Sequence, residues 1–184
     1  MSMITDEVYD RFKAALEAVA GKCYRTTKAD LGKAVVKALK EDYGYTDACL
    51  AETPLLKEAG VLEALKGDGI TTYTDHIRLH QETAKGGITE SQYAIADLGS
   101  IVQTGTEVDR RIVACLSELM ICVVKGSNVI AEWSDFFDTI GALPEHPNFV
   151  GIVTGPSRTS DIEMVSVVGV HGPLNLTAIV VEDE

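Results

Sequence analysis

Strand-like and helix-like segments alternate along this chain, and this alternation limits its possible folds more than any other feature. An amphipathic stripe of apolar residues in 8–19 ends at Gly21, and a second stripe follows a short strand candidate at 22–25. The continuous apolar run 119–124 is typical of a strand that is buried on both faces. Repeated strand–helix units with short connections predict an α/β fold, a mostly parallel sheet with helices on both faces.

Glycine, proline and aromatic spacing predict several element boundaries. Thr53-Pro54 predicts the start of one helix, whose apolar face runs to Leu65 and which ends at 67–69. Gly86-Gly87 is interpreted as a loop. Apolar residues at i, i+3, i+4 and i+7 predict the core face of a later helix: Trp133, Phe136, Phe137 and Ile140. The last strong strand predictions are 149–153 and 174–181.

Composition narrows the functional classes. The 184 residues suit a single domain over 1–184, and the formal net charge of -12 disfavours nucleic acid and anionic membrane surfaces as partners. No apolar run reaches the roughly 18 residues of a membrane span, so no membrane insertion is expected. The first residues lack the basic and apolar regions of a signal peptide, which predicts a cytoplasmic location.

The cysteines and histidines do not indicate a metal or another cofactor. Cys23, Cys49, Cys115 and Cys122 form no CxxC pair and no zinc or iron–sulfur spacing, and are expected to be reduced core residues. His76 and His80 lie at i, i+4 but lack the HExxH pattern. No nucleophile elbow, P-loop or dinucleotide-binding glycine motif appears either.

A polar stretch follows the strand candidate 149–153 and is the first candidate site. A polar pocket at a strand's carboxyl end is common in α/β proteins, which predicts a small anionic ligand here. Arg158 either holds a carboxylate or phosphate or forms a salt bridge with Asp161 or Glu163. The other residues either bind the anion or only turn the chain and cap a helix: Gly155, Ser157, Thr159 and Asp161.

Further candidates lie on both sides of this stretch. His171, before Gly172-Pro173, is either an acid, base or hydrogen-bond donor, or a structural residue of a tight turn; Gly172 joins the ligand-binding candidates. Asp97 is either a general base or a turn residue before Gly99, and the turn is favoured. Gly105-Thr106 with Arg110 is a second candidate anion contact, and the alternative is that Arg110 and Arg111 form a solvated pair.

Three segments together resemble the LUD domain family, whose best-known members are the LutC (YkgG-type) lactate utilisation proteins. The segments are A-I-A-D-L-G-S at 94–100, T-G-P-S-R-T-S-D-I-E at 154–163 and G-V-H-G-P at 169–173. The resemblance covers about residues 86–181. Asp97 and Leu98 stand where the family often has Glu and Thr.

The resemblance implies a Rossmann-like fold similar to the NagB/RpiA/CoA transferase group. It also implies a non-redox accessory or binding subunit, working with LutA-like and LutB-like iron–sulfur proteins that oxidise lactate to pyruvate. The alternative is a freestanding enzyme of that fold group. It would act on a small carboxylate, a sugar phosphate or an acyl-CoA, with Arg158 holding the anion and His171 as acid or base.

Overall fold

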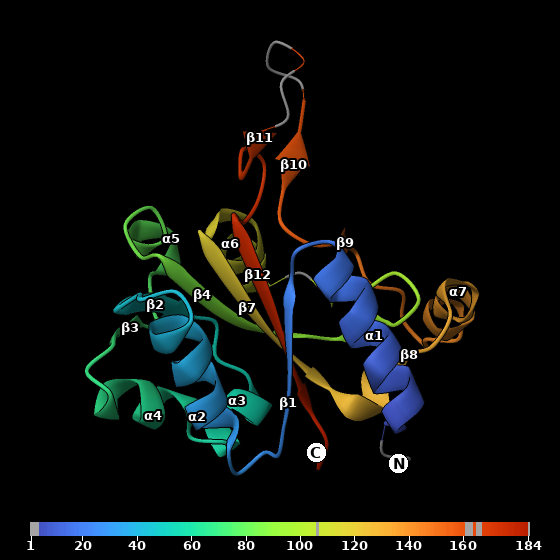
Figure 1. Ribbon diagram of the computed structural model, residues 1–184, viewed down its shortest axis with the longest axis horizontal. Coiled ribbons are helices and arrows are strands. Elements are labelled where there is room, and N and C mark those ends of the chain that lie inside the picture. The colour runs from blue at the N-terminus through green and yellow to red at the C-terminus, as the bar shows by residue number, and fades with distance from the viewer. Residues whose placement is uncertain (1–3, 106, 161–163, 165–166, 184) are drawn as a thin grey trace.

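A six-stranded parallel sheet forms the centre of the molecule (Figure 1). The computed structural model describes residues 4–105, 107–160, 164 and 167–183. Every neighbouring pair in this sheet is parallel, as the alternation of strands and helices predicts. In spatial order the strands are β1 (Lys22–Thr26), β12 (Asn175–Val181), β7 (Leu119–Lys125), β4 (Gly86–Ser91), β2 (Asp47–Leu50) and β3 (Thr71–Tyr73).

Helices cover both faces of this sheet, which confirms the predicted α/β class. One face carries α2 (Leu31–Val36), which continues into a π-helical turn η1 (Lys37–Glu41), and then α3 (Pro54–Glu58) and α4 (Val61–Gly67). The other face carries α1 (Asp6–Ala18), α5 (Ile77–His80) and α6 (Val108–Leu116).

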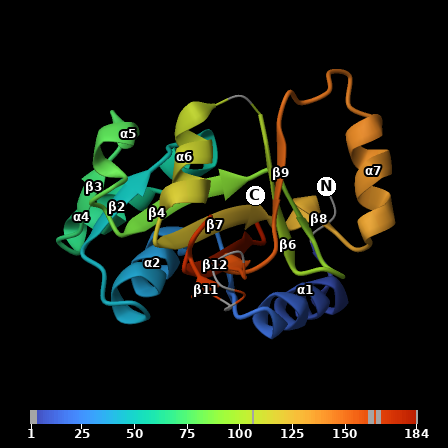
Figure 2. The same cartoon turned by 90° about the horizontal axis from the view of Figure 1, so that it is seen from above.

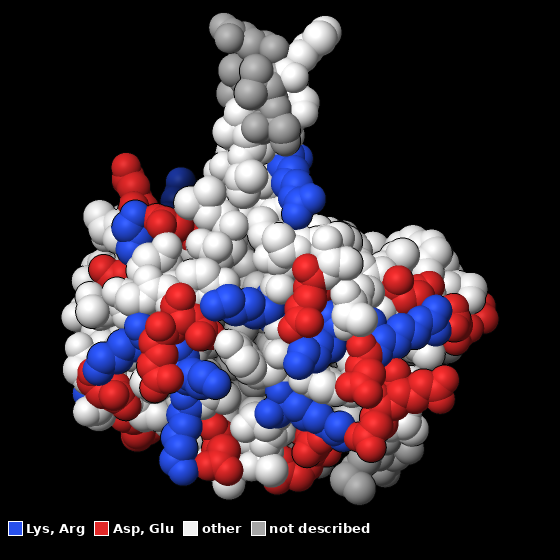
Figure 3. All heavy atoms as spheres, in the orientation of Figure 1, with Lys and Arg blue, Asp and Glu red and all other residues white. Residues whose placement is uncertain are grey.

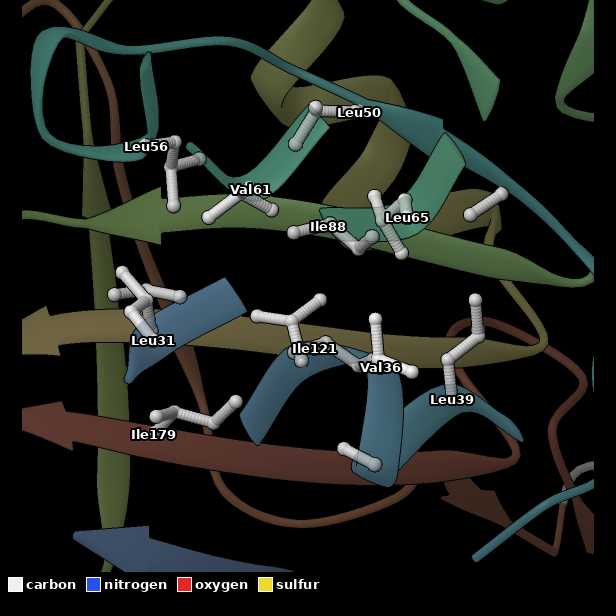
Figure 4. Packing of buried hydrophobic residues seen from close by; sticks show 14 of the residues in the cluster. Leu31, Val36, Leu39, Leu50, Leu56, Val61, Leu65, Ile88, Ile121 and Ile179 are labelled. Atoms are coloured by element: carbon white, nitrogen blue, oxygen red, sulfur yellow. The ribbon is translucent and has the colours of Figure 1, made fainter. Parts of the chain in front are cut away.

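The central strand β7 shows why the sequence pattern is continuously apolar. Leu119, Ile121 and Val123 pack toward α2 and α4, whereas Met120 and Cys122 pack toward α1. Figure 4 shows Leu31, Val36 and Leu39 above Ile121 and Ile179 of the sheet. Successive side chains of a strand point to opposite faces. A strand that is buried on both faces therefore has apolar residues throughout, without the alternation of polar and apolar residues of a half-exposed strand.

A second, four-stranded sheet lies beside the first. Its order is β8 (Val129–Ile130), β5 (Tyr93–Ile95), β6 (Ser100–Thr104) and β9 (Val150–Val153), where β6 pairs antiparallel with both β5 and β9. Helix α7 (Trp133–Gly141) packs on its outer face, away from the parallel sheet (Figure 2). The predicted strand at 149–153 is therefore real, but it is the edge of this sheet and not a strand of the parallel one.

Two boundary predictions were wrong because of glycine. The expected single helix over 55–65 breaks at Gly60, whose φ of +64° ends α3 and starts α4. Gly86 and Gly87 are not a loop but the first residues of β4. A Cβ atom on Gly87 would lie 1.7 Å from the Ser117 Oγ atom, so glycine here permits the close packing of α6 on the strand.

Two predictions of burial were also only partly correct. In α7, Phe136 is buried as expected, but Phe137 is 57% exposed because α7 has only the small sheet on one side of it. Cys23, Cys49 and Cys122 are buried free thiols, whereas Cys115 is exposed. Among the described residues, no helix is both long enough and apolar enough to span a membrane.

A two-stranded projection, here called the arm, stands out from the body (Figure 1). It consists of β10 (Arg158–Thr159) paired antiparallel with β11 (Val167–Val168). Figure 3 shows charged side chains of both signs over the visible face of the body, whereas the described part of the arm bears a basic group only at its base. The arm thus begins directly after the polar stretch that the sequence singles out.

Candidate functional site

The last two sequence motifs come together around one hollow of about 300 Å³, here called the motif hollow. The chain from the end of β9 to the start of β10 forms one wall, and the loop before β12 and the last turns of α6 form the others. Its lining residues are Ala114, Cys115, Ile152, Val153, Thr154, Gly155, Pro156, Ser157, Arg158, His171, Gly172 and Pro173. The sequence alone did not indicate that Cys115 would lie here.

Ser157 fastens the two motifs to each other. Its backbone N–H donates to the carbonyl oxygen of Pro173 at 2.9 Å, and its own carbonyl oxygen accepts from the Gly169 N–H at 2.9 Å. Its hydroxyl oxygen accepts from the His171 backbone N–H at 3.2 Å. Because the oxygen is the acceptor in this last bond, the hydroxyl proton of Ser157 remains a donor for a ligand.

The two glycines of the hollow allow close approach of neighbouring segments. Gly155 has a φ of +73°, and a Cβ atom there would lie 2.6 Å from the carbonyl oxygen of Val19. A Cβ atom on Gly172 would lie 3.2 Å from the Cβ atom of Ser157. Both glycines therefore shape the hollow, whether or not their backbone also contacts a ligand.

Arg158 contacts the end of α1. Its Nη2 atom donates to the carbonyl oxygen of Val19 at 3.1 Å, where the last carbonyls of the helix lack internal partners. A guanidinium has five N–H donors, so this bond leaves others for an anion in the hollow. The salt-bridge partners weighed from sequence, Asp161 and Glu163, lie outside the described residues.

The charge around the motif hollow differs from that of the rest of the chain. The sequence contains 28 acidic against 16 basic side chains, yet none of the Asp and Glu residues that the structure describes lines this hollow. Four other hollows in the described part of the chain each include at least two carboxylates. A cationic side chain without a nearby carboxylate favours an anionic ligand.

The remaining candidates are spread over several places. His171 is exposed and lines the motif hollow. Thr159 lies in β10 and does not line the hollow. Asp161 is outside the described residues. Gly105 donates its N–H to the carbonyl oxygen of Phe149, at the end of β9 opposite to the motif hollow.

Asp97 has a structural contact at another helix. Its Oδ2 atom accepts from the backbone N–H of Trp133 at 3.0 Å, the first residue of α7. The side chain at the N-cap position, Glu132, makes no capping bond and instead pairs with Arg11 at 2.5 Å. The Asp97 carboxylate thus caps α7 from the turn between β5 and β6, in keeping with the turn interpretation.

A larger hollow of about 460 Å³, here called the carboxyl-edge hollow, was not predicted as a unit. Residues that follow β2 and β3 and the first turn of α6 form it, so it lies at the carboxyl edge of the parallel sheet. Arg110 lines it, with its Nε atom 2.7 Å from Glu107 Oε2, and Lys57 pairs there with Glu52 at 3.5 Å. Its cations are therefore already matched by carboxylates.

Burial keeps two of the thiols protonated. It raises the pKa of Cys23 to about 12 and that of Cys49 to about 11, so both thiols are neutral at pH 7. Among the described residues, no three His, Cys, Asp or Glu side chains gather in a way that suits a metal ion.

Comparison with known proteins places this geometry in a family. Lactate utilization protein C of Geobacillus sp. (strain WCH70) is 29% identical over 192 residues, which span 97% of this chain and 79% of that protein. The uncharacterized protein YkgG of Escherichia coli (strain K12) is 25% identical over 178 residues, or 92% of this chain and 77% of that protein.

A solved structure shares the fold. The crystal structure of a DUF162 family protein from Deinococcus radiodurans matches with a TM-score of 0.65 at 20% identity, and the match covers 95% of this chain and 96% of that one. The model of the LUD domain matches residues 9–181, which include both sheets and the motif hollow. The chain therefore belongs to the LUD domain family.

Proposed function

We propose that this chain is a LutC-like lactate utilisation protein, the non-redox accessory or binding subunit of an iron–sulfur-dependent system that oxidises lactate to pyruvate. The names of several relatives, Lactate utilization protein C, support the pathway. The observation that carries the binding role is the motif hollow, which in an acidic protein holds Arg158 and is lined by no carboxylate of the described residues.

The proposed ligand is a small carboxylate such as lactate or pyruvate. Arg158 would donate two parallel N–H···O bonds to the carboxylate, because the spacing of the guanidinium N–H groups matches that of the carboxylate oxygens. The Ser157 hydroxyl would donate a further bond, since its oxygen is already held by the His171 N–H. Arg158 itself is positioned by the end of α1 through Val19.

The state of the buried thiols supports a non-redox role for this chain. The buried thiols of Cys23, Cys49 and Cys122 lie on three different strands of the parallel sheet and have raised pKa values because of burial. Protonated, buried thiols are poor metal ligands. We therefore assign electron transfer to iron–sulfur partner proteins rather than to this chain.

Binding of lactate and pyruvate to Arg158→Gln tests the ligand. We expect isothermal titration calorimetry to show at least about 10-fold weaker binding than in the wild type, because a charge-assisted hydrogen bond contributes about 1.5–3 kcal/mol. Arg158→Lys should lie in between, since it keeps the charge and loses the paired geometry.

Arg110→Gln is the matched control, because it removes the same group from the carboxyl-edge hollow. It should bind like the wild type. Loss of binding in Arg110→Gln with normal binding in Arg158→Gln would place the ligand in the other hollow and contradict the assignment.

Affinity purification from the native host tests the partner. We expect an iron–sulfur protein to co-purify with the tagged chain, visible by mass spectrometry and by its absorption above about 400 nm. Repeated recovery of this chain alone, from cells grown on lactate, would contradict an accessory role.

A freestanding enzyme is the second candidate, and one observation favours it: His171 lines the same hollow as Arg158. An imidazole beside a bound anion can serve as acid or base. Turnover by the isolated chain, lost in His171→Ala, would select this function over the first.

A further inference from the structure

β9 is an edge strand whose outer side is open. The bond from the Gly105 N–H to the Phe149 carbonyl oxygen continues the register that pairs Ile101 with Val153. In an antiparallel ladder only every second pair exchanges hydrogen bonds, so Phe149, Gly151 and Val153 bond to β6. The N–H and C=O groups of Val150 and Ile152 therefore point away from the sheet, and no other described residue bonds to them.

The side chains of this edge are apolar and exposed. Val150 is 40% exposed and Ile152 is 41% exposed, and both lie on the same face of the strand because they are two residues apart. An uncharged, apolar edge with free backbone groups is a template for another strand. Native proteins usually place a charge or a proline on such an edge, and β9 has neither.

The edge is also self-complementary. We propose that two copies of this chain form a dimer by antiparallel pairing of β9 with β9, with the two-fold axis at Gly151. Val150 of each copy then lies opposite Ile152 of the other. In each of these pairs, the open N–H and C=O groups of both residues face the other strand. The pairing thus uses all four open groups of each edge, and it makes two apolar cross-strand pairs.

The absence of charge along this edge allows a second copy as the occupant. Two chains with a net charge of -12 repel each other over most of their surface, so self-association needs a contact segment without charge. The eleven residues of 147–157 contain no charged side chain. The arm, which bears exposed Val168, rises from the same end of the molecule as β9 (Figure 1).

Cysteine cross-linking tests the register. Gly151→Cys, in a Cys115→Ser background that removes the exposed native thiol, places two thiols at the axis. The Cα atoms of a non-hydrogen-bonded pair lie about 4.5 Å apart, within disulfide range. We expect a disulfide-linked dimer on non-reducing gels at micromolar concentration. Leu79→Cys on α5, which is 74% exposed and lies away from the edge, is the control. Cross-linking of Gly151→Cys no faster than this control would overturn the pairing.

Val150→Pro gives an independent measurement by sedimentation equilibrium. The Val150 N–H is not used by β6, so proline removes a donor from the dimer and spares the sheet. We expect the wild type to sediment as a dimer and Val150→Pro as a folded monomer, with lactate binding retained because Val150 does not line the motif hollow. A monomeric wild type, or a dimer that Val150→Pro leaves intact, would overturn the inference without touching the proposed function.

Discussion

At the scale of single residues, the motif that identifies the family also holds the body of the protein together. Arg158 donates to the carbonyl oxygen of Val19, and a side chain at Gly155 would clash with the same oxygen, so the chain after β9 closes over the end of α1. Ser157 joins this stretch to the loop before β12 through its backbone and its side chain. A residue in such a motif can therefore be required for shape and still be available for a ligand.

Asp97, a candidate general base, has a structural role as the cap of α7. We expect Asp97→Ala to lower the free energy of unfolding by about 1–2 kcal/mol in urea denaturation, because the Trp133 N–H loses its acceptor at the start of α7. Asp97→Asn should lose less, since its amide oxygen still accepts this bond.

Lactate binding separates the two roles of Asp97. The residue does not line the motif hollow, so both variants should bind lactate like the wild type. A variant of normal stability that no longer binds would mean that Asp97 contacts the ligand and is more than a helix cap.

At the scale of elements, the sequence pattern was sufficient where strands are buried on both faces. β7 appeared in the sequence as a continuous apolar run and β12 as a strand rich in Thr, Ile and Val, and both are interior strands of the parallel sheet. Thr53-Pro54 also predicted the start of α3, where the Thr53 Oγ atom accepts from the Leu56 N–H at 3.4 Å. Caps and burial are local properties, which is why a local pattern reports them.

Pairing between elements could not be predicted in the same way. Gly86-Gly87 resembles a loop until Leu39 and Ser117 are packed against it, and those contacts come from distant parts of the chain. The sequence likewise suggested a strand before the polar stretch, but not that β9 would pair with β6 in a separate antiparallel sheet. The enzyme alternative already placed Arg158 and His171 in one site, whereas α6 as a wall of the motif hollow was not predicted.

At the scale of the whole molecule, an ion pair and a hydrogen bond connect the segments that precede three strands at the amino edge of the parallel sheet. Glu118 precedes β7, and its carboxylate contacts Lys85, which precedes β4, and Tyr45, which precedes β2. The hydrogen bond from Lys85, followed by that from Tyr45, lowers the pKa of Glu118 below its usual value of 4.5. The starts of three neighbouring strands are thereby joined by one carboxylate.

Acid should weaken this connection, and Glu118→Gln measures by how much. A carboxyl group whose pKa is lowered on folding stabilises the native state above its unfolded pKa, and this contribution is lost as the pH falls through the folded value. At pH 7 we expect Glu118→Gln to be less stable than the wild type by about 1 kcal/mol, because the amide cannot pair with Lys85 and the site is partly exposed. Below about pH 4 the difference should shrink, since protonation of Glu118 then removes the same charge from the wild type. Urea midpoints of both proteins between pH 3 and pH 7 test this, with Asp10→Asn, at an exposed position of α1, as a control for the loss of one negative charge. A gap that stays constant down to pH 3 would mean that Glu118 acts through its shape and not through its charge.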